Sequence, residues 1–582
     1  MTMIIPENKS TGNPFVSIIG FVVLTLGCSS LATAQSFVAT RLNQNEPLID
    51  SSTFSDVRAE GGNSINGASV IRIPSWIPAS ERVHSDAKFY MYFSNHAGDD
   101  IRLAWAKTIT GDWSLFNGEG GTSPDRAWGS RGNNTGTRTP GNGVFDIDLD
   151  DGTARPFDDS EVGVFNHVAS PDVHVDDRNQ RIVMYFHGEQ RNPVRPFVQN
   201  QKTFVATSEY GLNFNPESNG GEDGEGMREV VLGEFYFRTF EVNDQLFAYS
   251  NNAELWKAPN RNDRDQINNI SNADDEGGWW NPSSDHNVKA HWWNQRSERD
   301  NPIEELYRSI GEGIDDPRHF AIYTRAHINP DDTNVYVFYT AKGDAPESIF
   351  LTVIDTRNGS AIPGNWSFQG QDLILEPELD WEGGNQRIAT SGSGTANRVR
   401  QLRDPFIFED DKGTSSTADD DLFMFYSGGG EDAIGIALLS PVVNITKRNA
   451  SDFALDGGRG AANDQNVYLW NHDEDNVNQQ WIELARGGGN YSYQKLGTNH
   501  CIDGGKEGSS GQNVKLWRCD SSNQNQHWSR TDAGSGFVRL RKRNSGGFAI
   551  NGGSRGSDRQ NVNLSENSSR SQNLEWRITG VN

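Results

Sequence analysis

Cysteine is scarce in this sequence, with three residues in 582. Basic side chains are also few, since 52 lysines and arginines face 79 aspartates and glutamates, a formal net charge of −27. That charge argues against nucleic acid as a partner and favours a strongly solvated surface. Long apolar runs are rare, and the one at residues 15–34 is interrupted too soon for a membrane span. In their place the chain has 61 glycines and 16 tryptophans, a mixture typical of an all-β protein with many turns.

Residues 1–34 are expected to be a signal peptide rather than part of the fold. The apolar stretch ends in Ala32-Thr33-Ala34, a small-residue cleavage pattern, so we expect cleavage near Gln35 and export to the medium or periplasm. The letters "LTLGC" (24–28) also resemble a lipoprotein box ending at Cys28, which leaves a lipid anchor as the alternative. Only Cys501 and Cys519 then remain, and two nearby cysteines in an exported chain indicate one disulfide.

A segment of the C-terminal part recurs three times, at a spacing near 47 residues. The copies lie at 453–481 ("FALDGG…QQW"), 500–528 ("HCIDGG…QHW") and 548–576 ("FAINGG…LEW"). Three copies predict a closed threefold β structure. The repeat resembles the ricin-type β-trefoil lectins, also called carbohydrate-binding module family 13, over residues 441–582. Cys501 and Cys519 fall where that family places its intra-repeat disulfide.

The resemblance implies sugar sites built from an aspartate, an aromatic platform and an Asn/Gln pair. A sugar lays its apolar face on an aromatic ring and directs hydroxyls to carboxylate and amide groups. The matching residues are Asp456, Trp470, Asn478 and Gln479 in the first repeat, Asp503, Trp517, Asn525 and Gln526 in the second, and Asn551, Ser565, Asn573 and Leu574 in the third. Since the third copy lacks the aspartate and the platform, we expect two working sites and one structural copy. The alternative is that these tryptophans are only core residues, as Trp481, Trp528 and Trp576 are expected to be.

A divergent unit recurs five times over residues 36–440, beginning near 68, 170, 235, 318 and 403. Each unit has a strand, a polar turn, an aromatic strand such as "MYF", "VFY" or "MFY", and a third strand. Five such units predict a five-bladed β-propeller, with the stretch 251–315 as an insertion. The expected organisation is therefore all-β: a signal peptide (1–34), a five-bladed β-propeller catalytic domain (36–440) and a β-trefoil carbohydrate-binding domain (441–582).

Polar residues recur where first strands start and second strands end, positions that meet at one mouth of a propeller's funnel. The hairpin at 169–189 is the clearest case, because it carries Asp172, His174 and His187. The candidate catalytic residues are Asp172, His174, His187, Tyr236, Glu347 and Glu431, and the candidate substrate-binding residues are His96, His167, Arg238, Arg318, His319, Arg403 and Asp404. Arg403 and Asp404 could equally form a structural pair that closes the ring.

The blade openings "SPDVHVDD" and "RDPFIFEDD" resemble those of five-bladed glycoside hydrolases of the family 43, 62 and 117 type. The whole pattern is more similar still to a group of uncharacterised bacterial propeller proteins, which implies a fold and no reaction. The family 43 set is an aspartate on blade one, an aspartate on blade two and a glutamate on blade three. Asp172 matches the second, but Asn66 stands near the place of the first, and Glu234 only precedes "FYFR".

Three functions remain open for the propeller. In a glycoside hydrolase, Asp172 would act with Glu347, Glu431, Glu234 or His187 as acid and base. In a polysaccharide lyase, a histidine or Tyr236 would remove a proton while arginines neutralise a uronate carboxylate. The third function is glycan binding without catalysis. The three funnel arginines favour an anionic poly- or oligosaccharide.

No cofactor, metal site or stable protein partner is clearly indicated by the sequence. The letters "DIDLDDG" (146–152) are weakly calcium-like, with a solvated acidic loop as the alternative. The histidines permit a metal site, but their spacing is not diagnostic.

Overall fold

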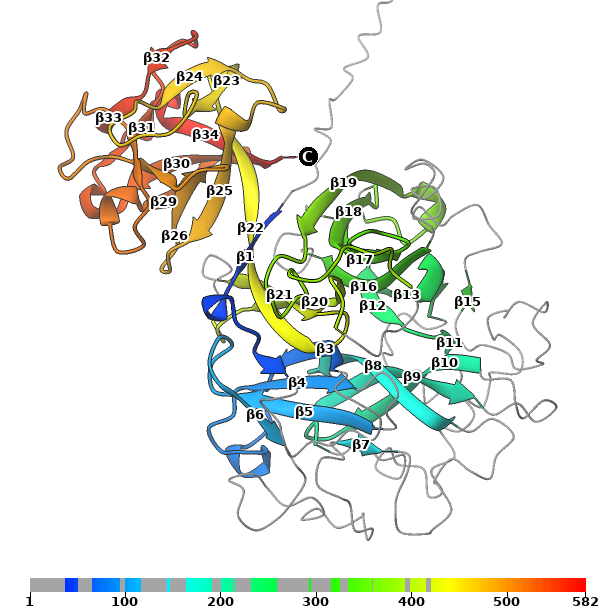
Figure 1. The fold of residues 1–582 in the computed structure, drawn as a ribbon. Coiled ribbons are helices and arrows are strands. Elements are labelled where there is room, and N and C mark those ends of the chain that lie inside the picture. The colour runs from blue at the N-terminus through cyan, green and yellow to red at the C-terminus, as the bar shows by residue number, and fades with distance from the viewer. Residues whose placement is uncertain are drawn as a thin grey trace, which may run out of the picture. The chain divides into compact units, whose positions relative to one another are not determined.

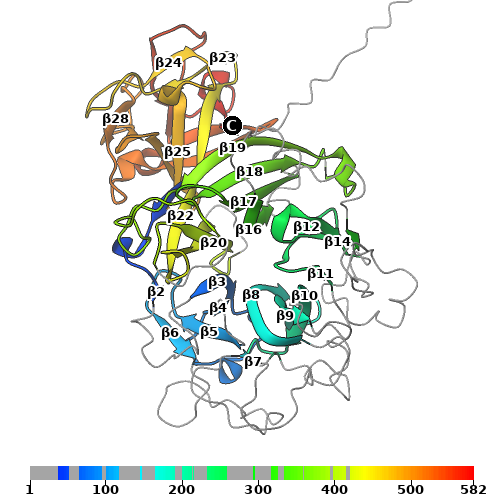
Figure 2. The same ribbon diagram turned by 45° about the vertical axis from the view of Figure 1, so that its right-hand side comes forward.

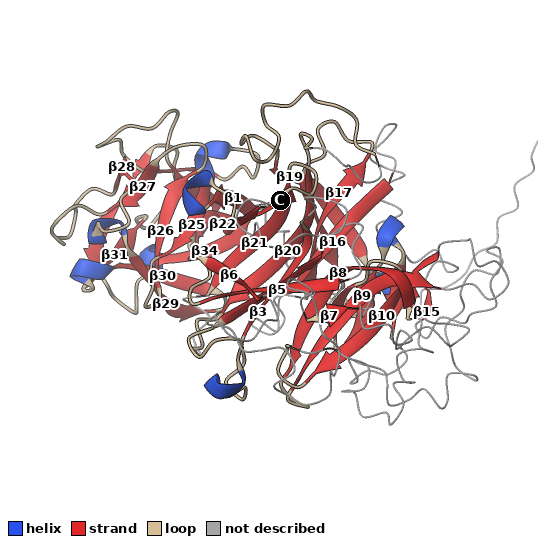
Figure 3. Ribbon diagram, turned by 60° about the horizontal axis from the view of Figure 1, so that its bottom comes forward, coloured by secondary structure: helices blue, strands red, loops and turns tan. Residues whose placement is uncertain are grey.

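The computed structural model describes residues 37–50, 65–94, 100–116, 144–146, 164–190, 200–212, 214, 232–258, 293–294, 316–324, 333–357, 359–392, 398–414 and 420–581. In these ranges the fold is all-β, with strands joined by turns and by 3-10 helices of three residues (Figure 3). Within the same ranges, no helix is long and apolar enough to cross a membrane. The expected signal peptide lies outside the described residues, as does most of "DIDLDDG".

Five groups of antiparallel strands follow one another along the chain (Figure 1). The first sheet contains β3 (Asn66–Arg72), β4 (Phe89–Ser94), β5 (Asp100–Ala106), β6 (Trp113–Phe116) and β7 (Phe145–Asp146). The second contains β8 (Val164–Asp176), β9 (Arg181–Gln190), β10 (Asn200–Ser208) and β11 (Gly233–Glu234). The third contains β12 (Arg238–Val242), β13 (Gln245–Tyr249), β14 (Leu255–Lys257) and β15 (Trp293–Asn294). The fourth contains β16 (Asp316–Thr324), β17 (Asn334–Lys342), β18 (Ile349–Asp355) and β19 (Ser367–Leu375). The fifth contains β20 (Leu402–Asp410), β21 (Asp421–Gly428) and the first half of β22 (Ala433–Lys447), together with β1 (Phe37–Arg41) and β2 (Ile49–Asp50).

The aromatic second strand of each unit is buried on both faces, which explains its composition. In β4, Tyr90 and Tyr92 enter the core shared with the second sheet, whereas Phe89, Met91 and Phe93 enter the core shared with the fifth. This alternation follows from the period of two in a strand. Further cores join the second sheet to the third, the third to the fourth and the fourth to the fifth. The sheets therefore follow one another around a common centre in a propeller-like arrangement, as expected (Figure 2).

The fifth sheet is completed by the first strand of the described chain. β1 pairs with β22 from Phe37 opposite Pro441 to Arg41 opposite Ala437. The Arg41 guanidinium also donates to Glu382, with Nε 2.8 Å from Oε1. Residues from the two ends of the expected propeller domain thus share one sheet.

Four of the five inner strands carry a residue in the left-handed backbone region at an equivalent position, and in the third sheet this residue comes two positions before β12. These residues are Gly67 (φ 65), Ser170 (φ 50), Tyr236 (φ 75), His319 (φ 54) and Asp404 (φ 46). In the first, second, fourth and fifth sheets the residue coincides with a β-bulge in the pairing of the inner strand. A left-handed backbone conformation is strained for residues other than glycine, and such strained residues are concentrated at functional sites.

The C-terminal strands form the β-trefoil. After the second half of β22 they are β23 (Ala450–Asp456), β24 (Tyr468–Asn471), β25 (Gln480–Ala485), β26 (Asn490–Lys495), β27 (His500–Asp503), β28 (Lys515–Arg518), β29 (Trp528–Gly534), β30 (Phe537–Lys542), β31 (Phe548–Asn551), β32 (Gln560–Asn561), β33 (Asn563–Glu566) and β34 (Glu575–Gly580). Trp481, Trp528 and Trp576 are fully buried, and each indole N–H donates to a backbone carbonyl oxygen 3.0–3.2 Å away. These three tryptophans are core residues, as expected, and the disulfide between Cys501 and Cys519 is present.

Short 3-10 helices lie between strands in both the propeller and the trefoil. They are η1 (Asn43–Asn45), η2 (Ala79–Glu81), η4 (Asn251–Ala253), η6 (Pro363–Asn365), η7 (Val477–Gln479), η8 (Gln524–Gln526), η9 (Arg543–Ser545) and η10 (Gln572–Leu574). In η7 and η8, Asn476 and Asn523 cap the first turn by accepting from the N–H groups of Asn478 and Asn525.

The fold differs from the sequence-based expectation in three respects. The propeller units have a fourth, outer strand, which is as short as two residues in β11 and β15 and so leaves little sequence pattern. The stretch 251–315 is not wholly an insertion, because it contains β14 and β15 of the third sheet. The expected boundary between residues 440 and 441 lies inside β22, which pairs with strands of both the propeller and the trefoil.

Candidate functional site

A cavity of about 740 Å³ is lined by all five inner strands of the propeller. Its wall includes Arg72 of β3, Asp172 of β8, Arg238 of β12, Ile322 of β16 and Phe408 of β20. It is therefore the central channel of the ring, and Asp172 and His174 are the two predicted catalytic residues that border it.

Asp172, His174 and Thr239 form a compact hydrogen-bonded group at this cavity. His174 Nε2 and the Thr239 backbone nitrogen lie 2.8 and 2.9 Å from Asp172 Oδ2. The Thr239 hydroxyl donates to the same oxygen at 3.0 Å and lies 2.8 Å from His174 Nε2. Asp172 is 3% exposed, whereas the side chain of His174 is 23% exposed. Thr239 thus holds the buried carboxylate of Asp172 in place, while the imidazole of His174 is partly exposed to solvent.

Asp172 is held in its ionised form despite its burial. Burial alone would raise the pKa of Asp172, but the charge and hydrogen bond of His174, the charge of Arg238 and the Thr239 N–H together lower that pKa below its usual value. A carboxylate that stays charged can act as a base or stabilise positive charge, but it is a poor proton donor.

Arg238 connects this group to a second one around Tyr236. Its guanidinium lies 4.3 Å from the centre of the Tyr236 ring, and Nη1 donates to the Ser170 carbonyl oxygen at 3.1 Å. The rings of His187 and His319 lie 5.9 and 5.5 Å from the Tyr236 ring, centre to centre. Four predicted residues from the second, third and fourth sheets therefore converge here, as the unit alignment predicts.

The Tyr236 hydroxyl donates to Asp404, another of the five left-handed residues. Burial and the negative charge of Asp404 raise the pKa of Tyr236 well above its usual value, so the phenol stays protonated at neutral pH. Asp404 is 2% exposed, and its Oδ2 has no hydrogen-bond partner in the described part of the chain.

Glu347 lies at the centre of a buried ion-pair network. Arg318 donates to both of its oxygens, from Nε at 2.9 Å and Nη2 at 2.8 Å. Arg403 Nε donates to Glu347 at 3.1 Å, and Arg403 Nη1 donates to Glu431 at 2.9 Å. Burial would raise the pKa of Glu347, but His319, Arg318 and Arg403 outweigh it and hold that pKa well below its usual range. This geometry suits a structural charge more than a proton donor.

The network also changes the interpretation of the funnel arginines. Arg318 and Arg403 are matched by Glu347 and Glu431, and Arg238 packs on Tyr236 beside Asp172. The charges of Arg318 and Arg403 are thus balanced by carboxylates, so two of the three arginines no longer support an anionic substrate in the propeller.

Among the remaining predicted positions, Glu234 is described and is not brought to this site. Glu234 lies on the outer strand β11, where it accepts from Lys202 Nζ at 2.6 Å. His96 lies outside the described residues, as do the side chains of Asn66 and His167.

The first two trefoil sites share one hydrogen-bond pattern. In the first, Asp456 accepts from the Gly458 N–H at 2.6 Å and from Gln479 Nε2 at 3.3 Å. In the second, Asp503 accepts from the Gly505 N–H and from Gln526 Nε2 at the same two distances. Both glutamines are fully buried, so they orient the aspartates, whereas Trp470, Trp517, Asn478 and Asn525 are partly exposed.

The third copy keeps the turn but not the site. Asn551 accepts from the Gly553 N–H at 2.7 Å in place of the aspartate, Leu574 is buried, Ser565 takes the platform position, and Asn573 accepts from Asn449 Nδ2 at 3.0 Å. Each repeat also has a lysine against its Gly-Gly pair, namely Lys495, Lys542 and Lys447. Lys495 donates to Gly460, and Lys542 donates to Asn544. The Lys447 ammonium is buried and has no hydrogen-bond partner among the described residues, and burial lowers the pKa of Lys447 to about 8.

Replacing Lys447 with Met is expected to flatten the pH dependence of trefoil stability above pH 8. In the wild type, the folded-state pKa of about 8 lies below the unfolded value of about 10.4, so the unfolded chain binds more protons between these limits. Stability should therefore rise with pH across this window, and the variant should lose that part of the rise. Thermal melts at several pH values test this, with the exposed Lys506 replaced by Met as control; equal pH profiles for the wild type and Lys447→Met would contradict it.

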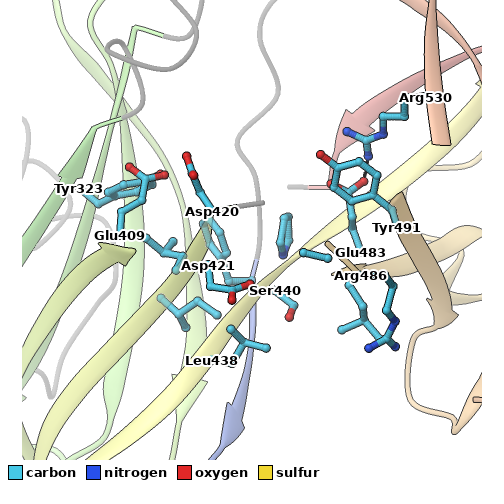
Figure 4. A pocket seen from close by; sticks show the side chains of 16 residues that line it. Tyr323, Glu409, Asp420, Asp421, Leu438, Ser440, Glu483, Arg486, Tyr491 and Arg530 are labelled. Atoms are coloured by element: carbon cyan, nitrogen blue, oxygen red, sulfur yellow. Dashed lines mark hydrogen bonds and ion pairs between the residues drawn. The ribbon is translucent and has the colours of Figure 1, made fainter. Parts of the chain in front are cut away.

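A second, smaller cavity lies beside β22, away from the predicted residues (Figure 4). It has a volume of about 260 Å³ and is lined by residues of β1, β16, β20–β22, β25, β26 and β29, including Glu409, Glu483, Tyr491 and Arg530, and by Asp420 just before β21. Across the described ranges, no group of three or more His, Cys, Asp or Glu side chains is placed to hold a metal ion.

Sequence reasoning missed the hydroxyl groups that position the carboxylates. Thr239 fixes Asp172, and Thr340 donates to Glu347 at 2.8 Å. Ser170 was passed over within "ASPDVHV", although it is the left-handed residue of its strand. Aligning the five units on their bulges would have identified Ser170, because it corresponds to Tyr236, His319 and Asp404.

Comparison with known proteins supports the trefoil and leaves the activity open. A family model described as ricin-type beta-trefoil lectin domain-like matches residues 477–565. An uncharacterized protein of Acanthamoeba polyphaga mimivirus is 24% identical over 385 residues, covering 65% of this chain and 83% of the relative. An exo-beta-1,3-galactanase from Clostridium thermocellum is 13% identical with a TM-score of 0.31, covering 93% of this chain and 100% of that chain. A GH43 beta-1,3-galactosidase is 10% identical with a TM-score of 0.34 and covers 94% of both chains. The designed threefold protein ThreeFoil is 26% identical with a TM-score of 0.22, covering 24% of this chain and 97% of its own.

Proposed function

We propose that this protein is a secreted glycoside hydrolase whose five-bladed propeller acts on a poly- or oligosaccharide and whose trefoil lectin domain holds that polysaccharide. The observation that carries the catalytic part is Asp172, a carboxylate kept ionised at the wall of the central cavity. Five sheets and five inter-sheet cores support the blade number. The trefoil match supports the carbohydrate-binding part.

Glycoside hydrolysis needs a carboxylate beside the anomeric carbon and a proton donor for the leaving oxygen. Asp172 takes the first role, since its low pKa keeps it charged. His174 takes the second, because it borders the cavity, contacts Asp172 and has an imidazole that can carry a proton. Asp404 and Glu347 then hold Tyr236 and the two arginines in place.

A polysaccharide lyase is the second candidate, and Tyr236 is the observation that favours it. This phenol lies between two imidazoles and beneath the Arg238 guanidinium, an arrangement that could remove a proton beside a carboxylate. The high pKa of Tyr236 weighs against its acting as the base.

A panel of neutral and acidic polysaccharides, assayed for reducing ends and for ultraviolet absorbance of unsaturated products, separates these functions. Reducing ends without ultraviolet absorbance would support the hydrolase, and absorbing products would support the lyase. Binding without either product would leave only the glycan-binding function.

Replacing both Trp470 and Trp517 with Ala is expected to abolish most retention of the protein on the polysaccharide. Stacking of a sugar ring on an indole depends on that apolar surface, which alanine lacks. Affinity electrophoresis measures retention, and activity on short soluble oligosaccharides should persist because the propeller is unchanged. Phe537→Ala, which removes an aromatic ring on the β29–β30 hairpin, serves as a control. Retention of the double variant at the wild-type level would refute the assignment.

A further inference from the structure

Each trefoil platform is bordered by a loop from another repeat. The loop residues at equivalent positions are Asp464, Gly511 and Arg559, all in the left-handed region, with φ of 67°, 87° and 61°. The Asp464 N–H donates to the Leu516 carbonyl oxygen beside Trp517, and the Gly511 N–H donates to that of Leu564 beside Ser565. Gln560, which follows Arg559, pairs with Leu469 beside Trp470. The threefold arrangement thus places one loop residue next to each platform.

The side chains at these positions differ as the platforms do. The Arg559 guanidinium lies 5.6 Å from the centre of the Trp470 ring. Asp464 pairs with Lys515, whose ammonium lies 5.0 Å from the centre of the Trp517 ring. Gly511, which has no side chain, stands beside the copy that has lost its platform. A side chain is therefore present only where there is a tryptophan for it to border.

Backbone strain makes this correlation informative. A left-handed conformation strains an L-residue that has a side chain, and glycine avoids this strain. Aspartate tolerates the region better than most residues, but arginine has no such advantage. Glycine occupies this position only beside the third copy, which has no platform, whereas Asp464 and Arg559 occupy it beside the two tryptophans despite the backbone strain. This distribution points to a role for those two side chains in ligand binding.

The two platforms consequently differ in charge. Arg559 is exposed, and in the described part of the chain its guanidinium makes no ion pair or hydrogen bond. Asp558 accepts from the Asn471 N–H at 2.9 Å and fixes the loop beside the platform strand. At the second platform Asp464 neutralises Lys515. Among the described residues, the cation against the first platform is therefore unpaired, whereas the cation against the second platform is ion-paired.

We propose that Arg559 makes the first trefoil site selective for sugars that carry a carboxylate or sulfate group, while the second site takes neutral sugars. An anionic sugar stacked on Trp470 would receive two parallel N–H bonds from the planar guanidinium. The inference rests on the lectin function proposed above and assigns a ligand class to one of its sites.

The test compares the two sites one at a time by isothermal titration. Each inactivated site carries Trp→Ala, so Trp517→Ala leaves the first site and Trp470→Ala leaves the second. The probes are matched oligomers, of galactose against galacturonate and of glucose against glucuronate. With only the first site present, the acidic partner should bind roughly three- to tenfold more tightly, and added salt should reduce that preference. With only the second site present, no acidic preference should appear.

Arg559→Gly separates a ligand role from a structural one. This variant should lose the acidic preference and keep its affinity for the neutral partner, while its melting temperature stays equal or rises because glycine relaxes the strained φ. Arg559→Lys should keep most of the preference. Asp464→Gly, which leaves Lys515 without its ion-pair partner beside Trp517, should give the second site an acidic preference. An acidic preference that survives in Arg559→Gly would overturn the inference alone. If no oligomer binds either to the wild type or to the Trp470→Ala variant, the lectin proposal and this inference are both overturned.

Discussion

Turnover by the Asp172→Asn variant is expected to fall by about 10²–10⁴-fold, the usual cost of losing a catalytic acid or base. The amide is nearly isosteric and can still accept from the Thr239 N–H, but it carries no charge and cannot act as a base. The measurement is kcat on the polysaccharide identified by the panel, with circular dichroism to verify the fold. Because the pKa of Asp172 is lowered, the acid limb of the wild-type kcat/KM profile should lie below about pH 4, under the ordinary aspartate value.

Asp176 supplies the matched control for this variant. It lies on the same strand, is 8% exposed, and its pKa is also lowered, since hydrogen bonds from Asn179 and Arg181 outweigh its burial. Asp176→Asn should therefore disturb the strand in a similar way while leaving turnover at the wild-type level. Equal activity of the Asp172 and Asp176 variants would show that the cavity wall at Asp172 is not where catalysis occurs.

The order of strands in the propeller could be predicted from sequence because burial imposes a pattern on them. The second strand of each unit lies between two cores, so both of its faces must be apolar, and aromatic residues fill the space. The third strands were found by the same logic. The shortest fourth strands cannot be predicted in this way, because a two-residue strand such as β11 has no periodicity. The sequence alone therefore does not separate Glu234 on β11 from the inner-strand residues.

The candidate site was predictable only as a set of positions. Aligning the units places Tyr236, His319 and Asp404 at one level of the ring, and the structure joins them. Residue types alone do not predict which of the site residues pair with one another. Arg318 and Arg403, for example, come from different units and both donate to Glu347. The sequence presents three arginines as free cations, and only the partners of Arg318 and Arg403 show that these two are neutralised.

In the trefoil, the residues of each site could be predicted from the sequence, but the contacts between repeats could not. Its repeat identifies the aspartates, the platforms and the disulfide, since each has a fixed position in the copy. The neighbours of each platform come from other repeats, so the alignment of one copy on another does not reveal them. Asp464 and Arg559 look like ordinary loop residues until the strands bring each beside another repeat's tryptophan.

Replacing Glu347 with Gln is expected to destabilise the propeller by about 3–5 kcal/mol, the cost of breaking a buried ion pair by removing one partner. Glu347 is fully buried, and its two oxygens accept from Arg318, Arg403 and Thr340. The amide removes the negative charge and turns two donor hydrogens toward guanidinium groups that also donate. Two buried arginines are then left with Glu431 as their remaining carboxylate in this network. Urea unfolding of the full chain, followed by tryptophan fluorescence, measures the change.

Glu378→Gln is the control, because Glu378 pairs with Arg41 at 3.0 Å but its side chain is 65% exposed. A solvent-exposed pair of this kind contributes up to about 1 kcal/mol, so that variant should remain close to the wild type. The pH dependence gives a second check. Since the folded-state pKa of Glu347 is held well below its usual range, the stabilisation is complete above the unfolded value of about 4.3 and is lost as pH falls below it. The gap between the wild type and Glu347→Gln should therefore be constant from pH 5 to 8 and narrow on acidification, and a gap no larger than that of the Glu378 variant would contradict a structural role for this network.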